Sequence, residues 1–80
     1  MRSNPSRVVV AAADYVESLF HEGKRLISLQ TFSGEHCSGT IVEQDIQPFP
    51  LKVVLTVLNS ITNEQQTFDL SEVANIQPLS

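Results

Sequence analysis

Eighty residues supply enough surface for one hydrophobic core and not for two, so a single domain over residues 1–80 is expected. Hydrophobic residues make up 41% of the chain and charged residues 18%, a balance that excludes a disordered chain. The net charge is −4, and from residue 26 onward one base, Lys52, stands against six acids, which argues against a surface for nucleic-acid phosphates.

Residues 6–22 are predicted to form a helix. Pro5 suits its first turn, because the missing N–H would have no intrahelical partner there. Gly23 ends the helix, and Lys24 and Arg25 follow where the helix dipole favours positive charge. Core packing is the expected use of the apolar stripe, and docking of another protein is the alternative. The stripe consists of Val9, Ala12, Ala13, Val16, Leu19, Phe20 and Gly23.

The apolar run at residues 8–13 does not have the length of a targeting or membrane segment. Asp14 ends it, which makes it shorter than the hydrophobic region of a signal peptide. No segment approaches the roughly 20 apolar residues of a membrane span. Cys37 is the only cysteine, so no intrachain disulfide can form, and a lone thiol fits a reducing compartment. We therefore expect a cytoplasmic protein with no membrane association.

Beyond Gly23 the pattern changes to short apolar alternations separated by turn residues. Residues 26–32 form the first predicted strand, with Ile27 and Leu29 on one face. Gly34 marks the turn that follows. Residues 36–46 form the second predicted strand, and Gly39 inside it indicates a sharp bend or a close approach between backbones.

The rest of the chain completes a sheet. Residues 47–50 are predicted to be a loop, because two prolines remove two ladder donors, and residues 52–58 are β-branched and expected to be the most buried strand. Residues 65–70 and 73–76 form the last two predicted strands. The fold class is α+β and mainly β: an N-terminal helix followed by a strongly bent antiparallel sheet over residues 26–77, which forms a half-open barrel whose end the helix covers.

The strand-turn-strand around Gly34 and Gly39 resembles the first sequence motif of Sm and Sm-like proteins. The spacings Gly-x4-Gly and Gly-x-Ile-x3-Asp match that motif, and Val73-x-x-Ile76 resembles the end of the second one. The resemblance implies a five-stranded Sm-like barrel in which Gly34 makes the turn and Gly39 lets the second strand curve. The matching positions are Ile27, Leu29, Gly34, Gly39, Ile41 and Asp45.

Both places that hold RNA in this family are changed here. Four residues past Asp45, where the family has an RNA-binding Asn, the chain has Phe49 between prolines. Where the second motif has a basic residue and a glycine, it has Asp69 and Leu70. These changes disfavour a uridine-binding ring. In its helix-first layout and acidity the chain is similar to Rof-type inhibitors of the Rho termination factor, which implies a basic, nucleic-acid-binding protein as partner.

The candidate catalytic groups have ordinary structural interpretations. His36 and Cys37 could form a nucleophile or a metal site, but adjacent strand residues point to opposite faces, so one buried and one exposed residue is expected. Glu43 and Asp45 are two apart and share a strand face. No catalytic residue, metal or cofactor is predicted.

The sequence predicts a non-enzymatic regulatory or adaptor domain that binds another protein in transcription or RNA metabolism. The alternative is an RNA-binding Sm-like ring that uses Arg7, Lys24 and Arg25, and a subunit contributing to a shared enzyme site is a third hypothesis. A homo-oligomer is compatible with the first two hypotheses. Partner binding is assigned to Glu43, Asp45, Phe49, Asp69 and Glu72. As alternatives, Asp69 and Glu72 could cap helices, and Phe49 could fold back over the open end of the barrel.

Overall fold

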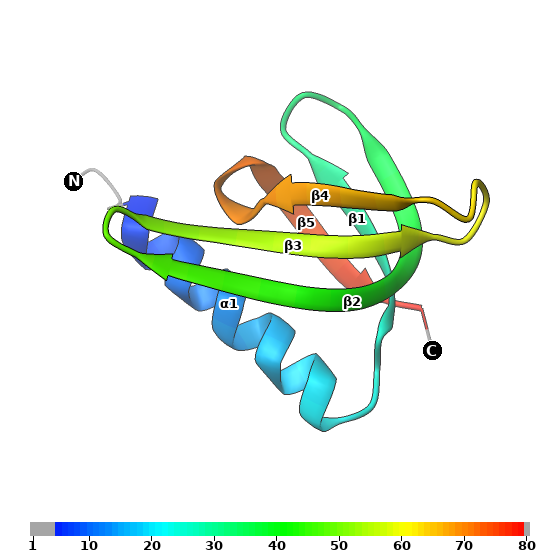
Figure 1. Ribbon diagram of the computed structural model, residues 1–80, viewed down its shortest axis with the longest axis horizontal. Helices are drawn as coiled ribbons and strands as arrows, with labels where there is room; N and C mark the ends of the chain where they lie inside the picture. The colour runs from blue at the N-terminus through cyan, green and yellow to red at the C-terminus, as the bar shows by residue number, and fades with distance from the viewer. Residues whose placement is uncertain (1–4, 80) are drawn as a thin grey trace.

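The computed structural model describes residues 5–79, in which one helix precedes a five-stranded antiparallel sheet (Figure 1). The strand order is β4-β3-β2-β1-β5. This confirms the predicted fold class. The elements are α1 (Pro5–His21), β1 (Leu26–Thr31), β2 (His36–Pro48), β3 (Leu51–Asn59), β4 (Gln65–Asp69), a short 3-10 helix η1 (Leu70–Glu72) and β5 (Val73–Pro78).

Helix α1 forms where the apolar spacing predicts it and buries the predicted stripe. Val9, Ala13, Val16 and Leu19 are buried, while Ala12 and Phe20 are partly buried against the same core. The helix ends in a Schellman motif: the N–H of Gly23 donates to the carbonyl of Phe20 at 3.1 Å, and that of Lys24 donates to Leu19 at 2.8 Å. Gly23 has a φ of 73°, a conformation that glycine adopts without strain.

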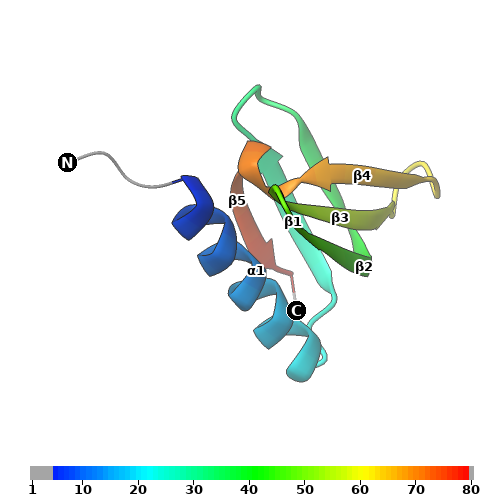
Figure 2. The ribbon, with the colours of Figure 1, turned by 60° about the vertical axis from the view of Figure 1, so that its left-hand side comes forward.

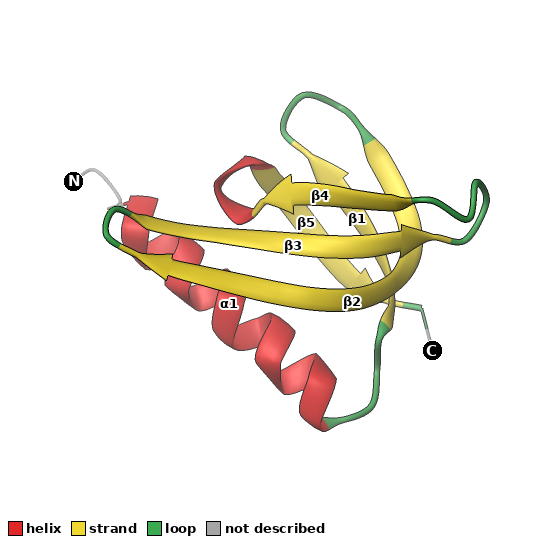
Figure 3. Cartoon of the chain, viewed as in Figure 1, coloured by secondary structure: helices red, strands yellow, loops and turns green. Residues whose placement is uncertain are grey.

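Strand β2 is long and bent, and it joins the two halves of the sheet (Figure 3). Gly39 lies at the junction, because it pairs with Ile27 of β1 on one side and with Asn59 of β3 on the other. A methyl group at Gly39 would overlap the backbone carbonyl of Leu58. The backbones of β2 and β3 therefore approach as closely as the sequence predicts, and only a residue without a side chain fits between them.

The helix lies on one side of the sheet, and the core fills the space between the two (Figure 2). The inner face, which is the face toward α1, carries Ile27 and Leu29 of β1 and the alternate residues Val53, Leu55 and Val57 of β3, all buried. Strands β4 and β5 are the two ends of the strand order, so the sheet stays open over the described residues. The barrel expected from the sequence is thus a bent sheet.

The two proline-containing strand ends differ from the prediction. Gln47 and Pro48 belong to β2, because Pro48 is the last residue of the strand and this part of β2 pairs with β3 alone. Pro78 belongs to β5, where the neighbouring Leu79 N–H donates to Leu26 of β1. The nitrogen of Pro78 therefore faces the open edge of the sheet, where a strand does not need a donor.

The close approach at Gly39 predicts a large stability difference between two glycine variants. We expect Gly39→Ala to lower the free energy of unfolding by about 3 kcal/mol, because β2 and β3 must separate to admit the methyl group. Gly34→Ala is the matched control: its methyl group meets open space, and the φ of 95° costs about 1 kcal/mol. Urea denaturation of both variants measures the difference, and equal losses would contradict this account.

Candidate acidic surface and neighbouring sites

Three of the predicted binding residues lie together on the outer face of the sheet, the face turned away from α1. Asp45 pairs with Val54 of β3, and Val54 pairs with Asp69 of β4, so the two carboxylates flank one valine across three strands. With strands about 4.8 Å apart, their backbones lie about 10 Å from each other. Glu43 follows on the same face, opposite Thr56. The predicted shared face of Glu43 and Asp45 is confirmed.

Asp69 also has the structural role that its residue type allows. Its carboxylate oxygen Oδ1 accepts hydrogen bonds from the backbone N–H of Ser71 at 3.0 Å and from the Ser71 hydroxyl at 2.9 Å. It therefore caps η1, as expected for an aspartate at a helix start. Glu72 lies in η1 and is not part of the outer-face group, so the structure separates the two acids that the sequence places three residues apart.

Phe49 lies at the tip of the β2–β3 hairpin. Its side chain is 95% exposed, so it does not fold back over the open end of the sheet. Ile46 before the turn and Leu51 after it are also exposed. An exposed aromatic ring with apolar neighbours is a common feature of surfaces that bind other proteins.

The His36–Cys37 pair is split between the two faces, as predicted. Cys37 is 3% exposed, and its thiol donates to the side-chain carbonyl of Gln66 at 3.4 Å, while Asn59 donates to its sulfur at 3.7 Å. Burial raises the pKa of the Cys37 thiol, and the bond from Asn59 partly offsets this rise. His36 is on the outer face, with Nε2 2.8 Å from the Ser28 hydroxyl. The imidazole and the thiol therefore cannot act as one catalytic pair.

Gln44 links the sheet to the helix, a contact that the sequence analysis missed. Its amide nitrogen donates to the carbonyl of Ala13 at 3.4 Å and to the carboxylate of Glu17 at 3.2 Å. Its amide oxygen is buried and has no partner among the described residues. The available signal was its strand position: Gln44 lies between two outward acids and thus on the core-facing side of β2.

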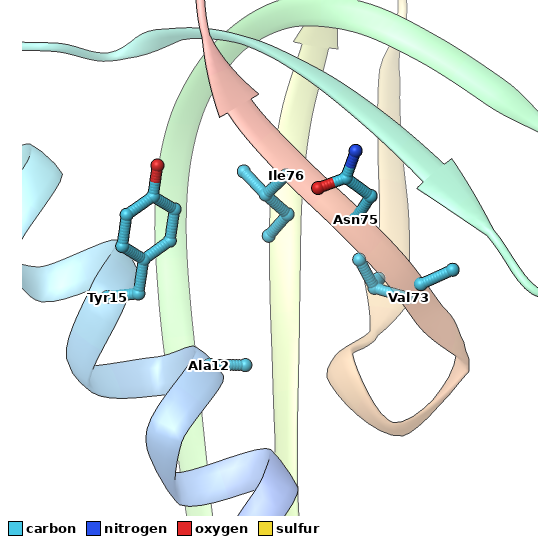
Figure 4. Close-up of a pocket in the computed structure, with 6 residues that line it drawn as sticks. Ala12, Tyr15, Val73, Asn75 and Ile76 are labelled. Atoms are coloured by element: carbon cyan, nitrogen blue, oxygen red, sulfur yellow. The ribbon is translucent and has the colours of Figure 1, made fainter.

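Two hollows lie outside the acidic surface. One, of about 250 Å³, runs between α1 and the edge strand β5, where Ala12 and Tyr15 face Val73 and Ile76 (Figure 4). The other, of about 360 Å³, lies between the β1–β2 turn and η1. It is lined by Phe32, Ser33, Ser71 and Glu72.

The basic residues of the alternative RNA hypothesis do not form one group. Arg7 lies in the first turn of α1, and Lys24 and Arg25 follow its last turn. A helix of 17 residues is about 25 Å long, which separates the two ends. The Arg25 guanidinium lies over the Phe20 ring, 5.2 Å from its centre. The side chain of Arg7 lies outside the described part of the chain.

Over residues 5–79, no three His, Cys, Asp or Glu side chains are grouped so that they could hold a metal ion. Within the same range, no helix is both long enough and apolar enough to cross a membrane.

The comparisons with known proteins identify the fold. No protein-family model matches the sequence, and no curated protein matches it. Among solved structures, the chain is similar to XC5848 from Xanthomonas campestris, whose crystal structure is described as adopting a novel variant of the Sm-like motif. The TM-score is 0.71 at 15% sequence identity, and the similarity covers 100% of this chain and 90% of that chain.

This similarity confirms the predicted Sm-like fold. An identity of 15% shows the fold alone and carries no information about a shared ligand or partner. The likeness to Rof-type inhibitors stays a prediction.

The environment of Cys37 predicts a pH-dependent term in stability. Its pKa is raised in the folded protein, so the unfolded chain loses the thiol proton first as the pH rises. We expect the free energy of unfolding to fall as the pH rises above the ordinary thiol pKa, and Cys37→Ala to lack this component. Urea denaturation of both proteins over a pH series measures it, and parallel pH profiles would contradict the expectation.

Proposed function

We propose that this protein is a non-enzymatic adaptor or regulatory domain of the cytoplasm that binds another protein through its acidic outer face. The observation that carries the proposal is the placement of Glu43, Asp45 and Asp69 together on the outer face of β2, β3 and β4. Phe49 at the adjoining hairpin tip supplies an apolar anchor. Transcription or RNA metabolism is the setting that we propose.

The charge of the surface supports a basic partner. Carboxylates on β2 and β4, on either side of β3, give a negative potential that steers a positively charged protein toward the sheet. Lys52, the one base from residue 26 onward, lies on the same outer face at the hairpin end of β3, where the three carboxylates outnumber it. A protein surface that normally holds nucleic acid has the complementary charge. The acidic face would then compete with the nucleic acid for that surface.

The side-chain arrangement also supports binding rather than catalysis. The Glu43 and Asp45 side chains are exposed, so no apolar pocket encloses them as it would a carboxyl group that acts in acid–base catalysis. His36 and Cys37 lie on opposite faces of β2. An RNA-binding ring remains the alternative because the fold is Sm-like, but the separated basic residues weigh against it.

Charge reversal on the outer face tests the proposed interaction. We expect Glu43→Lys with Asp45→Lys to abolish most capture of a basic partner from a native-host lysate, because attraction becomes repulsion. Asp14→Lys, with Asp14 exposed on α1, is the matched control and should capture normally. Quantitative mass spectrometry of the captured proteins compares them. Equal recovery by all variants would reject the acidic face as the binding surface.

Assembly state and RNA affinity separate the adaptor from the ring. We expect a monomer or a dimer by light scattering, and weak, sequence-independent binding of single-stranded oligouridine at physiological salt. The acidic sheet repels phosphates, so adding the Glu43→Lys and Asp45→Lys changes should strengthen the residual RNA binding. A hexamer or heptamer with tight oligouridine binding would replace the adaptor with the RNA ring.

A further inference from the structure

The hollow between the β1–β2 turn and η1 combines an aromatic ring, a carboxylate and two hydroxyl groups. Phe32 and Ser33 come from the turn, and Ser71 and Glu72 come from η1. The backbone N–H of Phe32 donates to the carbonyl of Glu72 at 2.9 Å, which holds the two walls together. At about 360 Å³, the hollow has room for one long side chain of another molecule.

The aromatic wall is exposed although its backbone is firmly fixed. The Phe32 ring is 74% exposed. The turn that carries it is closed by hydrogen bonds from the Gly34 and Glu35 backbone N–H groups to the carbonyl and hydroxyl oxygens of Thr31, at 3.1 and 3.0 Å. The Thr31 and Ser33 hydroxyls are 2.8 Å apart. The ring is therefore presented by a preorganised turn, so binding a ligand would cost little conformational entropy in the backbone.

The electrostatic surroundings of the hollow favour a cation. Glu72 is exposed, Glu35 lies in the same turn as Phe32, and Asp69 precedes η1. The one base of this half of the chain, Lys52, lies two residues before Val54, the partner of Asp69, so the three acids outnumber the single base around η1. A cation in the hollow would meet a carboxylate at one wall and the negative face of an aromatic ring at the other.

Arginine matches these walls better than other cations do. Its guanidinium group is planar, so it can stack on an aromatic ring while its edge donates two hydrogen bonds to a carboxylate. We propose that this hollow binds an arginine side chain of the partner, stacked on Phe32 and paired with Glu72. This inference rests on the proposed function, because it specifies the chemistry by which the same basic partner is held at a second place.

Titration with a single arginine derivative tests the hollow without the partner. The probe is Nα-acetyl-arginine amide, and its neutral citrulline counterpart is the control, since it has the same shape and no charge. In a ¹⁵N-labelled sample, we expect shifts of the amide signals at Phe32, Ser33, Ser71 and Glu72 with arginine and none with citrulline. Equal responses to both compounds, or shifts only elsewhere, would overturn the inference.

Substitutions of the exposed residues Glu72 and Phe32 test whether each one contributes to binding of the arginine derivative in the hollow. Glu72→Gln should raise the Kd of the arginine derivative about tenfold, because the amide is neutral and keeps one acceptor oxygen where the carboxylate has two. Phe32→Leu should raise it about threefold, because an apolar side chain remains and the aromatic face does not. Glu64→Gln, in the exposed β3–β4 turn, is the control and should leave the Kd unchanged. Unchanged affinity in both wall variants would also overturn the inference.

The same variants separate this inference from the proposed function. Glu43→Lys with Asp45→Lys should leave the arginine titration unchanged while partner capture is lost. If Glu72→Gln and Phe32→Leu capture the partner at full strength, the hollow does not bind an arginine of the partner. The adaptor proposal would still stand in that case. Arginine-specific shifts that disappear in both variants, together with reduced capture, are the expected result.

Discussion

The rest of the structure depends on the contact of two backbones at Gly39. Strand β2 passes from β1 to β3 at Gly39 and Thr40, and Gly39 pairs with Ile27 and with Asn59 at the same time. Any side chain there would overlap the carbonyl of Leu58. Because β2 bends at this point, one strand serves both halves of the sheet. An 80-residue chain can thereby wrap a core that a flat sheet of the same length would leave exposed.

The bend gives the two faces of the sheet different roles. The inner face is covered by α1, and the amide of Gln44 ties the two layers through Ala13 and Glu17. The outer face has no covering layer among residues 5–79, so its side chains remain available at the surface. Glu43 and Asp45 lie on it because the register of β2 shifts between Ile41 and Glu43, so alternate residues that are buried up to Ile41 face outward beyond the shift. Stability and the proposed recognition thus use opposite sides of the same strands.

Much of the fold followed from local patterns. The helix was predicted within one residue at each end, because its apolar stripe and Gly23 are local signals. The prediction failed at Pro48 and Pro78. Proline is excluded from strand positions whose backbone N–H must donate to a neighbouring strand, and these two positions need no such donor. Whether a strand end has a neighbour on both sides is a tertiary fact, so the residue type could not reveal it.

The sequence by itself determined the helix, the strand alternation, the shared face of Glu43 and Asp45, and the need for a small residue at position 39. These depend on spacing within one element, which the backbone geometry fixes. The tertiary structure alone decided that the sheet stays open, that Asp69 joins the outer-face acids, and that Phe32 meets Glu72 across a hollow. Those outcomes depend on how strands from distant parts of the chain pair and bend, because residues forty apart become neighbours only through that pairing.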